Sequence, residues 1–328
     1  MSAAGLAAPE MGGEAAARGI RVGFIVGPTG AGKSALALEV AVRVGAEIVN
    51  ADSRQFYRGM DLGTAKPTAA ERARVAHHII DVCAPDAPLD VAGFTALARE
   101  AIAEIAARGR RVLVVGGSGL YLRALRGGIF CGPAAAPEFR ARLEREAAEW
   151  GVERLHARLI TIDPEAAARI GHNDRYRIIR ALEVFELTGE PISRHQARHA
   201  FAAREYDTLT VGLSPERARL YTEIDRRFDA MVEAGLVNEV RALLAQGYAP
   251  DRPPLAAIGY KHIAMHLRGE LTLGEAIALA KRDSRRLAKR QLTWFRADAE
   301  LKWLDAARAT EHALDLFREF FGNPQESN

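Results

Sequence analysis

The stretch "IRVGFIVGPTGAGKSALALEVAVRV", residues 20–44, decides the fold. It opens with a short apolar run, which predicts a buried strand. It closes with apolar residues at every fourth position (Leu36, Val40 and Val44), which predicts a helix. Between them "GPTGAGKS", residues 27–34, matches the G-x-x-x-x-G-K-[ST] pattern of a phosphate-binding loop. A strand, a glycine-rich loop and a helix in this order are the context in which that pattern binds phosphate.

The predicted loop forms an anion site mainly from its backbone. Successive N–H groups and the N-terminus of the following helix surround a bound phosphate. Lys33 adds a positive charge, and the Ser34 hydroxyl is placed to bind Mg²⁺. The pattern does not identify the phosphate-bearing molecule, and ATP or GTP is the first candidate. The residues predicted to line the phosphate site are Gly27, Pro28, Thr29, Gly30, Ala31, Gly32, Lys33 and Ser34.

Strand and helix patterns continue to alternate after the loop. Residues 46–53 and 110–119 predict buried strands, and residues 91–109 predict a helix that ends at a glycine. Alternation of this kind produces a parallel sheet whose ligand lies at the carboxyl edge of the strands. We therefore predict an α/β fold with a P-loop NTPase-like parallel-sheet core.

The pattern changes after Gly128, where only helical periodicity follows for about 70 residues, roughly the size of a small domain. Strand-like segments return at 206–214 and 299–306. We interpret the middle of the chain as a helical insertion into the core. The predicted organisation is a disordered tail (1–19), a P-loop α/β core (20–128 and 201–328) and a helical insertion (129–200).

The composition is typical of a globular protein. Of the 328 residues 48% are hydrophobic and 27% charged, which provides enough apolar material for one or two packed domains. No apolar run reaches the roughly 18 residues that cross a bilayer, and the first residues lack the pattern of a secretory signal. The two cysteines, Cys83 and Cys131, are far apart and favour a reducing compartment, so we expect a cytoplasmic location.

Acidic residues near the predicted site separate several classes of enzyme. Nucleotide hydrolases with this loop use a second acidic ligand for Mg²⁺. The strand at 110–119 instead ends in glycines and Ser118, which argues against an ordinary ATPase or GTPase. Asp52 follows a neighbouring parallel strand, so its carboxylate is expected at the same edge. Spacing alone leaves Asp52 two roles, a catalytic group or a turn or cap residue.

The segment "KRDSRRLAKRQLTWFR", residues 281–296, is strongly basic. Arg282, Arg286 and Arg290 recur at every fourth position, so one face of a helix carries a row of like charges that destabilises it. A nucleic-acid backbone would offset this repulsion, with bases stacking on the aromatic residues at the end of the segment. A second basic cluster lies at 172–180. A solvated basic face is the alternative interpretation.

Two histidine pairs have a spacing that can bind zinc on a helix. They are His195 with His199 and His262 with His266. Neither pair carries the glutamate of the H-E-x-x-H motif, and no third ligand is evident. We therefore predict surface histidines and no zinc site.

Eight segments of the chain resemble, in the same order, those of bacterial tRNA dimethylallyltransferases, also called tRNA isopentenyltransferases. The resemblance spans roughly residues 20–305. It implies transfer of a dimethylallyl group from dimethylallyl diphosphate to N6 of adenosine 37 in tRNAs reading codons that begin with U, with Mg²⁺ as cofactor. The segments are "GPTGAGKS", "ADSRQFYRGMDLGTAKPT", "HHIIDV", "GGSGLYLRAL", "NDRYRIIRALEVFELTGEPIS", "GLVNEVRALLAQG", "AIGYKH" and "RQLTWFR".

The resemblance also implies roles for individual residues. Asp52 matches the general base of the family, and Thr29 and Lys33 match catalytic residues that hold the diphosphate. Arg241 resembles an arginine that helps to clamp it. The residues that the resemblance and the basic helix together place on tRNA are Asp52, Ser53, Arg54, Gln55, Ser118, Arg140, Asn173, Asp174, Arg175, Tyr176, Arg177, Arg282, Arg286 and Arg290.

Three alternatives share part of this pattern. A P-loop small-molecule kinase shares the loop and the Mg²⁺ but does not explain the basic helix. An adenylate isopentenyltransferase, which acts on free AMP, has less need of two basic clusters. An RNA-binding protein with a degenerate loop does not explain the intact Lys33 and Ser34. The expected partners are the tRNA anticodon stem-loop and dimethylallyl diphosphate, and we expect a monomer with no membrane and no obligate protein partner.

Overall fold

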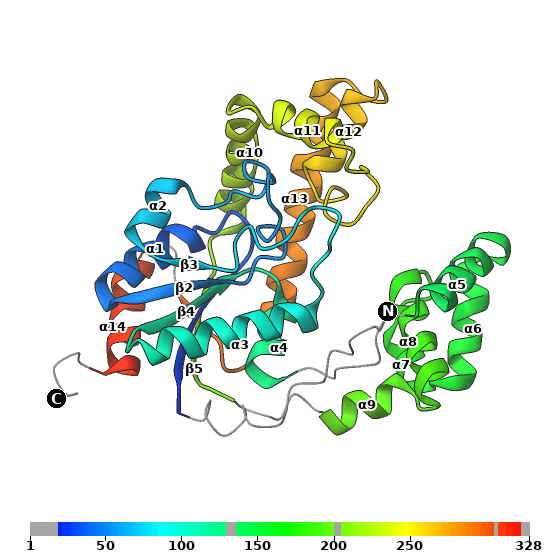
Figure 1. The fold of residues 1–328 in the computed structure, drawn as a ribbon, viewed down its shortest axis with the longest axis horizontal. Helices are drawn as coiled ribbons and strands as arrows, with labels where there is room; N and C mark the ends of the chain where they lie inside the picture. The colour runs from blue at the N-terminus through cyan, green and yellow to red at the C-terminus, as the bar shows by residue number, and fades with distance from the viewer. Residues whose placement is uncertain (1–18, 129–135, 200–204, 305–307, 323–328) are drawn as a thin grey trace, which may run out of the picture. The chain divides into compact units, whose positions relative to one another are not determined.

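The computed structural model describes the chain in four ranges, 19–128, 136–199, 205–304 and 308–322 (Figure 1). All but the last residue of the predicted tail, and Cys131, lie outside these ranges. Contacts divide the chain into two units, residues 1–126 with 205–328 and residues 127–204. The predicted insertion falls within the second unit. None of the helices in the described ranges has the length and hydropathy needed to cross a bilayer.

The first unit is built on a six-stranded sheet in the order β3-β2-β4-β1-β5-β6. Every pair of neighbouring strands runs parallel, so the predicted α/β fold class is confirmed. β1 lies in the interior of the sheet and carries the phosphate loop at its carboxyl end. The strands are β1 (Arg21–Val26), β2 (Ala46–Asn50), β3 (His77–His78), β4 (Arg111–Gly116), β5 (Asp207–Leu213) and β6 (Lys302–Leu304).

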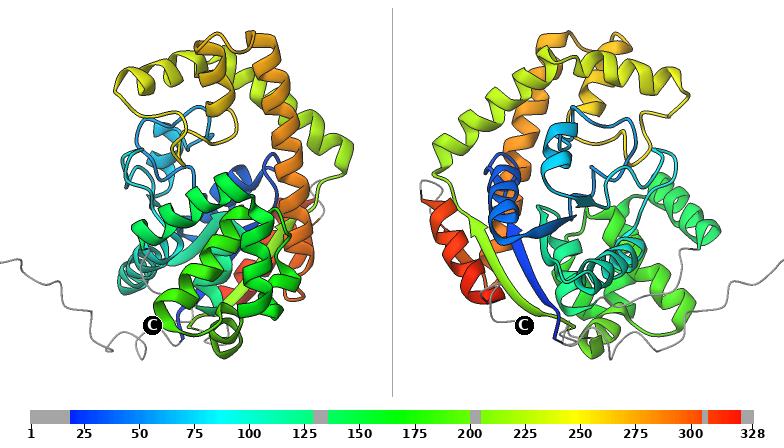
Figure 2. Two further views of the ribbon diagram at one scale, coloured as in Figure 1. Left: turned by 90° about the vertical axis from the view of Figure 1, so that its right-hand side faces the viewer. Right: turned by 60° about the vertical axis from the view of Figure 1, so that its left-hand side comes forward.

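Helices cover both faces of this sheet, as the nearly continuous apolar strands require. On one face Phe24 of β1 packs with α3 (Val91–Ala107). On the other face Ile25 packs with α1 (Lys33–Val44) and α14 (Ala309–Phe321). Successive side chains of a strand point to opposite faces, so the two cores alternate along β1. Figure 2 shows α3 and α14 on opposite sides of the sheet.

One group of helices of the first unit lies beyond the carboxyl edge of the sheet (Figure 1): α10 (Arg217–Glu233), α11 (Leu236–Ala245), α12 (Tyr260–Leu267) and α13 (Leu273–Arg296). α13 packs against both α10 and α12. Its Lys281 and Arg285 form ion pairs with Asp229 and Asp225 of α10. The remaining helices of this unit are α2 (Ala69–Arg74) and α4 (Gly119–Gly127).

The second unit is helical throughout its described residues. Its core contains the buried residues Leu143, Leu155, Leu159 and Leu182, of which Leu155 and Leu159 lie one helical turn apart. This core is separate from the two that cover the sheet, so the unit has apolar packing of its own. Its helices are α5 (Pro137–Trp150), α6 (Val152–Ile162), α7 (Pro164–Arg169), α8 (Arg175–Thr188) and α9 (Ile192–His199).

The close approach of β4 to the segment after β2 requires a glycine at position 116. A Cβ atom there would lie 2.3 Å from the carbonyl oxygen of Ala51. This contact is with the backbone, which cannot turn aside as a flexible side chain can. We therefore expect Gly116→Ala to lower the free energy of unfolding by about 1–3 kcal/mol, measured by urea denaturation.

Gly274→Ala is the matched control for this substitution. Gly274 lies in the first turn of α13, and no atom lies within 4 Å of the added Cβ. Alanine is the better helix former by up to about 1 kcal/mol, so this variant should be neutral or slightly more stable. Equal stability of the two variants would contradict the close approach at Gly116.

Candidate active site

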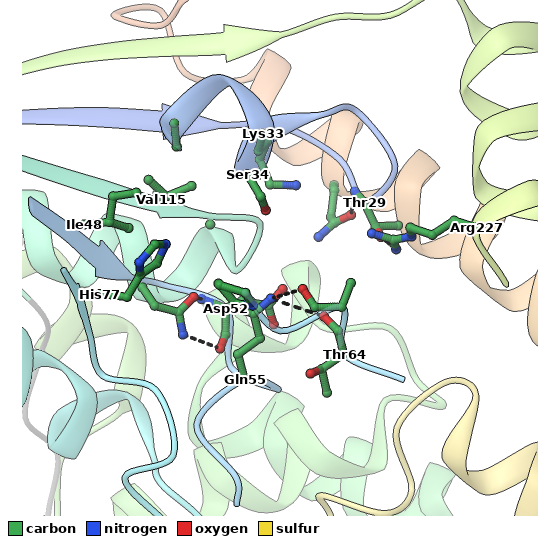
Figure 3. A pocket seen from close by; sticks show the side chains of 16 residues that line it. Thr29, Lys33, Ser34, Ile48, Asp52, Gln55, Thr64, His77, Val115 and Arg227 are labelled. Carbon is green, nitrogen blue, oxygen red and sulfur yellow. Dashed lines mark hydrogen bonds between the residues drawn. The ribbon is translucent and has the colours of Figure 1, made fainter. Parts of the chain in front are cut away.

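A pocket lies at the carboxyl edge of β1, β2 and β4, where the parallel sheet predicts a ligand. Its inner cavity has a volume of about 90 Å³. Figure 3 shows Lys33 and Ser34 on one side of the pocket and Asp52 and Gln55 on the other. The lining residues are Thr29, Lys33, Ser34, Ala37, Ile48, Asn50, Asp52, Gln55, Thr64, Ala65, Pro67, His77, Val115, Gly116, Arg227 and Gln291.

The phosphate loop takes the conformation that its glycines allow. Gly30 and Gly32 have φ of 81° and 87°, in the left-handed region that side chains with a Cβ disfavour. Gly32 immediately precedes α1 and provides no side-chain cap, so the first N–H groups of the helix are not occupied by a cap. With the positive end of the helix dipole, these groups form an anion site.

Lys33 lies half-buried at the start of α1 and lines the pocket. Its Nζ donates a hydrogen bond to the carbonyl oxygen of Pro28 over 2.8 Å. Burial lowers the pKa of Lys33 to about 8, and the positive charge of Arg227 acts in the same direction, whereas Asp52 partly opposes them. The ammonium group is therefore poised to lose its charge only slightly above neutral pH.

Thr29 is held from two sides. Its backbone N–H donates to Oε1 of Gln291 over 2.9 Å. Its Oγ1 accepts a hydrogen bond from the guanidinium of Arg227 on α10. Burial lowers the pKa of Arg227, although Asp52 partly opposes the shift. Arginine remains charged at any ordinary pH, so Arg227 brings a fixed positive charge into the pocket.

Arg227 was not predicted as a site residue, and the predicted Arg241 lies elsewhere. Arg241 is exposed on α11 and donates to Oδ1 of Asn238 over 2.5 Å. It does not line the pocket that contains the phosphate loop. The packing of α10 against the phosphate loop brings Arg227 to the pocket, and no sequence pattern indicates that packing. The role of Arg241 in clamping the diphosphate stays a prediction, whereas Arg227 is the arginine that lines the pocket.

Asp52 makes the hydrogen bond of a turn residue and also lines the pocket. Its Oδ1 accepts a hydrogen bond from the N–H of Arg54 over 3.0 Å, which is the bond of a turn residue. Its side chain also lines the pocket opposite Lys33 (Figure 3). Asn50 fixes the backbone here, because its Oδ1 accepts from the N–H of Asp52 and its Nδ2 donates to the carbonyl of Ile79.

The other predicted tRNA residues of the segment 52–55, and Ser118, lie in or beside the pocket. Gln55 lines it and donates from Nε2 to the carbonyls of Thr64 and Ala65. The N–H of Ser53 donates to Oγ of Ser118 over 3.2 Å, which joins two of the predicted residues. Arg54 is exposed and donates to the carbonyl of Pro253. Ser53, Arg54 and Ser118 are therefore neighbours of the pocket and do not line it.

Buried Lys66 and half-buried Glu239 hold the loop that carries these groups. The Lys66 side chain is only 2% exposed and forms ion pairs with Asp61 and Asp81. The Glu239 carboxylate of α11 accepts a hydrogen bond from the N–H of Leu62 over 2.7 Å. The N–H groups of Asp61 and Gly63, on either side of Leu62, donate to the same carboxylate. Sequence reasoning missed both, since neither has a spacing that distinguishes it from a surface charge.

Four of the predicted tRNA residues of the second unit have partners within it, and Arg175 and Arg177 form ion pairs with Glu144 and Asp174. Arg140 forms an ion pair with Glu183, which is fully buried. Asp174 caps α8 by accepting the N–H of Arg177 over 3.2 Å. A buried carboxylate needs such pairing, because an uncompensated charge is costly in the interior. Arg140 and Asp174 therefore stabilise this unit itself, apart from any part in binding.

The start of α8 exposes the rest of this predicted set. The Tyr176 side chain is 72% exposed, although tyrosine usually buries much of its ring. Arg175 and Arg177 flank it in the chain, and an exposed aromatic ring between basic residues suits stacking against a base beside phosphate groups. The exposed residues around it are Asn173, Arg175 and Arg177.

The predicted basic face of α13 is present on its surface. Arg282, Arg286 and Arg290 are exposed. Asp283 reduces their mutual repulsion, since its Oδ1 lies 3.2 Å from the Arg282 guanidinium and 3.5 Å from that of Arg286. The repulsion expected from sequence is thus partly offset within the helix.

The histidine prediction is wrong at one position. His262 is only 3% exposed, and its Nε2 lies 3.3 Å from Asp283. Burial lowers the pKa of His262, although Asp283 partly opposes the shift. It is a core residue because its face of α12 packs against α13. Among the described residues no three His, Cys, Asp or Glu side chains form a metal-binding group.

Comparison with known proteins identifies the family. A family profile described as IPP transferase matches residues 55–298. The chain is 50% identical over 301 residues to the tRNA dimethylallyltransferase of Geobacter metallireducens, covering 92% of this chain and 97% of the relative. It is also 50% identical to that of Syntrophobacter fumaroxidans, over 90% of this chain and 86% of the relative. The chain belongs to the IPP transferase family.

Solved structures of this family have the same fold. The full-length tRNA isopentenylpyrophosphate transferase of Bacillus halodurans matches with a TM-score of 0.68 and 41% identity, over 92% of this chain and 96% of that one. A eukaryotic dimethylallyltransferase studied while acting on tRNA matches with a TM-score of 0.79 and 26% identity, over 94% and 81%. The predicted resemblance, fold class and enzyme class, a tRNA dimethylallyltransferase, are confirmed.

Replacement of Arg227 tests its place in the anion site. Arg227→Ala removes a charge-assisted hydrogen bond and is expected to weaken pyrophosphate binding about ten- to a hundredfold, measured by isothermal titration calorimetry. Arg241→Ala is the control and should bind pyrophosphate like the unmodified protein. Weaker binding by the Arg241 variant and normal binding by the Arg227 variant would reverse this assignment.

The lowered pKa of Lys33 gives pyrophosphate binding a distinctive pH dependence. Below about pH 8 Lys33 is charged, and above it the free site loses this charge, so affinity should fall as pH rises from 7 to 9. Binding above pH 8 should also take up a proton at Lys33. Lys33→Arg should remove this part of the pH dependence, because arginine stays protonated. Calorimetry in buffers of different ionisation enthalpy measures both effects, and an unchanged profile in the arginine variant would contradict them.

Proposed function

We propose that this chain transfers the dimethylallyl group of dimethylallyl diphosphate to N6 of adenosine 37 in tRNAs that read codons beginning with U. The products are the N6-dimethylallyl nucleoside and diphosphate. One observation carries the proposal: the pocket places the cations Lys33 and Arg227 opposite the carboxylate of Asp52. A leaving group and a proton can therefore depart on opposite sides of one reacting centre.

The cationic side of the pocket stabilises the leaving group. As the allylic C–O bond breaks, negative charge grows on the diphosphate. Lys33, Arg227 and the loop amides are already oriented toward this position, so little reorganisation is needed during the reaction. Such preorganised electrostatic stabilisation supplies a large part of the rate enhancement in many enzymes.

The pocket also has the oxygen ligands that suit Mg²⁺. The Ser34 hydroxyl and the Asp52 carboxylate line it together. Mg²⁺ is usually bound by one or two protein oxygens, water and substrate phosphates, so a dedicated group of acidic ligands is not required. We propose that Ser34 holds Mg²⁺ beside the diphosphate, and the ion, when bound, neutralises part of the developing charge.

Asp52 accepts the proton in this scheme. The exocyclic amine of adenine is a weak nucleophile, because its lone pair is delocalised into the ring. A C–N bond forms at the allylic carbon, the C–O bond breaks, and the N6 proton passes to the Asp52 carboxylate. General-base assistance of this kind is worth about 10²–10⁴-fold in rate. The turn bond to the N–H of Arg54 holds one carboxylate oxygen and orients the group.

Recognition of tRNA is assigned to surfaces in both units. In the first unit we propose the segment from Asp52 to Gln55, together with Ser118, for the target nucleotide. The basic face of α13 then contacts the phosphate backbone, where affinity falls as salt rises. In the second unit we propose Arg140 and the exposed start of α8 as residues that contact tRNA. We also propose that the protein acts in the cytoplasm as a monomer without an obligate protein partner.

Substrate specificity tests the proposed reaction directly. The protein is incubated with dimethylallyl diphosphate and tRNA, with dimethylallyl diphosphate and AMP, and with ATP and small acceptors. Prenylated adenosine is expected in the tRNA reaction alone, detected by mass spectrometry of the digested nucleosides. Prenylated AMP would instead indicate an adenylate isopentenyltransferase, and a phosphorylated acceptor would indicate a P-loop kinase.

Replacement of Asp52 tests the general base. Asp52→Ala is expected to slow prenyl transfer by two or more orders of magnitude, because proton removal loses its acceptor. Binding of tRNA, measured by filter retention, should change little. Asp86→Ala, an exposed aspartate on the loop before α3, is the control and should keep full activity. Full activity of the Asp52 variant would show that Asp52 is not the general base and only stabilises the turn.

A further inference from the structure

Gln291 makes a pair of hydrogen bonds that no step above uses. It lies on α13 and lines the pocket. Its Oε1 accepts the N–H of Thr29, and its Nε2 donates to the carbonyl oxygen of Gly117, each over 2.9 Å. One partner is a donor and the other an acceptor, so the amide fits in a single orientation. A side chain with only one kind of polar atom cannot make both bonds.

The turn after β4 leaves room for this side chain. A Cβ at Gly117 would lie 2.6 Å from Nε2 of Gln291, and one at Gly119 would lie 2.4 Å from the Trp294 ring. Backbone and helix are therefore in direct contact with no side chain between them. Because α13 lies this close to the turn, Gln291 can bond both the turn and the phosphate loop.

Thr29 of the phosphate loop is held by hydrogen bonds from two helices. Arg227 of α10 holds the hydroxyl of Thr29, and Gln291 of α13 holds its N–H. α10 and α13 are themselves joined by ion pairs of Asp225 with Arg285 and of Asp229 with Lys281. The position of the loop is therefore set by a braced pair of helices as well as by its own sequence.

We propose that Gln291 is a positioning residue for the diphosphate of the donor. Both of its bonds are to backbone, so it fixes the path of the loop on which the phosphate-binding groups lie. It takes no part in bond making or breaking. This inference deepens the proposed function and rests on it for the identity of the donor, while the anion site itself can be tested with pyrophosphate alone.

Gln291→Met tests the proposal, because methionine has a similar length but neither polar atom. We expect the KM for dimethylallyl diphosphate and the Kd for inorganic pyrophosphate to rise about tenfold, the equivalent of one net hydrogen bond or two weak ones. The Kd for tRNA should stay within twofold of the unmodified value. Thr293→Val is the matched control: Thr293 is exposed on the same helix, its hydroxyl bonds only the carbonyl of Lys289, and all three constants should stay unchanged.

Gln291→Glu provides a second measurement if the methionine variant does not fold. The carboxylate still accepts the N–H of Thr29 but has no donor for the Gly117 carbonyl, and it adds negative charge at an anion site. Its Kd for pyrophosphate should rise more than tenfold. Unchanged donor and pyrophosphate constants, or equal losses for donor and tRNA with a lowered melting temperature, would overturn the proposal. Absence of transfer by the unmodified protein, with these pyrophosphate results intact, would overturn the proposed reaction alone.

Discussion

The burial of β1 inside a parallel sheet is the constraint on which the site depends. β1 pairs with β4 on one side and β5 on the other, and helices cover both faces. Its direction is thereby fixed, so the loop after Val26 can emerge only at the carboxyl edge. The segments after β2 and β4 emerge at the same edge, because all three strands run parallel. A single set of strand pairings thus brings together the phosphate loop, Asp52 and the turn at Gly117.

Buried and half-buried polar groups hold the loops at this edge of the sheet. Asn50 satisfies both ends of its amide, Lys66 pairs with two aspartates, and Glu239 accepts several backbone N–H groups. Each group would be costly to bury alone. These hydrogen bonds also hold a strained backbone. Ile79, whose carbonyl accepts from Asn50, has a φ of 60°, which is unusual for a β-branched residue. Such strain persists only where the surroundings over-determine the backbone.

The sequence predicts those parts of the site that lie close together in the chain and follow a known residue pattern. The strand, loop and helix of residues 20–44 are contiguous, and their spacing specifies both the fold class and the anion site. Arg227 and Gln291 could not be found this way, because each reaches the loop from a helix far along the chain. The placement of Arg241 meets the same limit, since periodicity does not show which helix packs against the loop. His262 shows the same limit in the prediction of burial, because the sequence pattern did not show which face of α12 is covered.

The charge arrangement suggests why the site lies where α10 and α13 meet the sheet. α13 turns Lys281 and Arg285 toward α10 and leaves Arg282 and Arg286 on its surface. The inward pairs brace the helix without consuming the outward charges, which remain available to a polyanion. Further along the same helix Gln291 contacts the phosphate loop. One rigid element therefore presents a basic surface and supports the donor site, and a change in its packing would be felt at both.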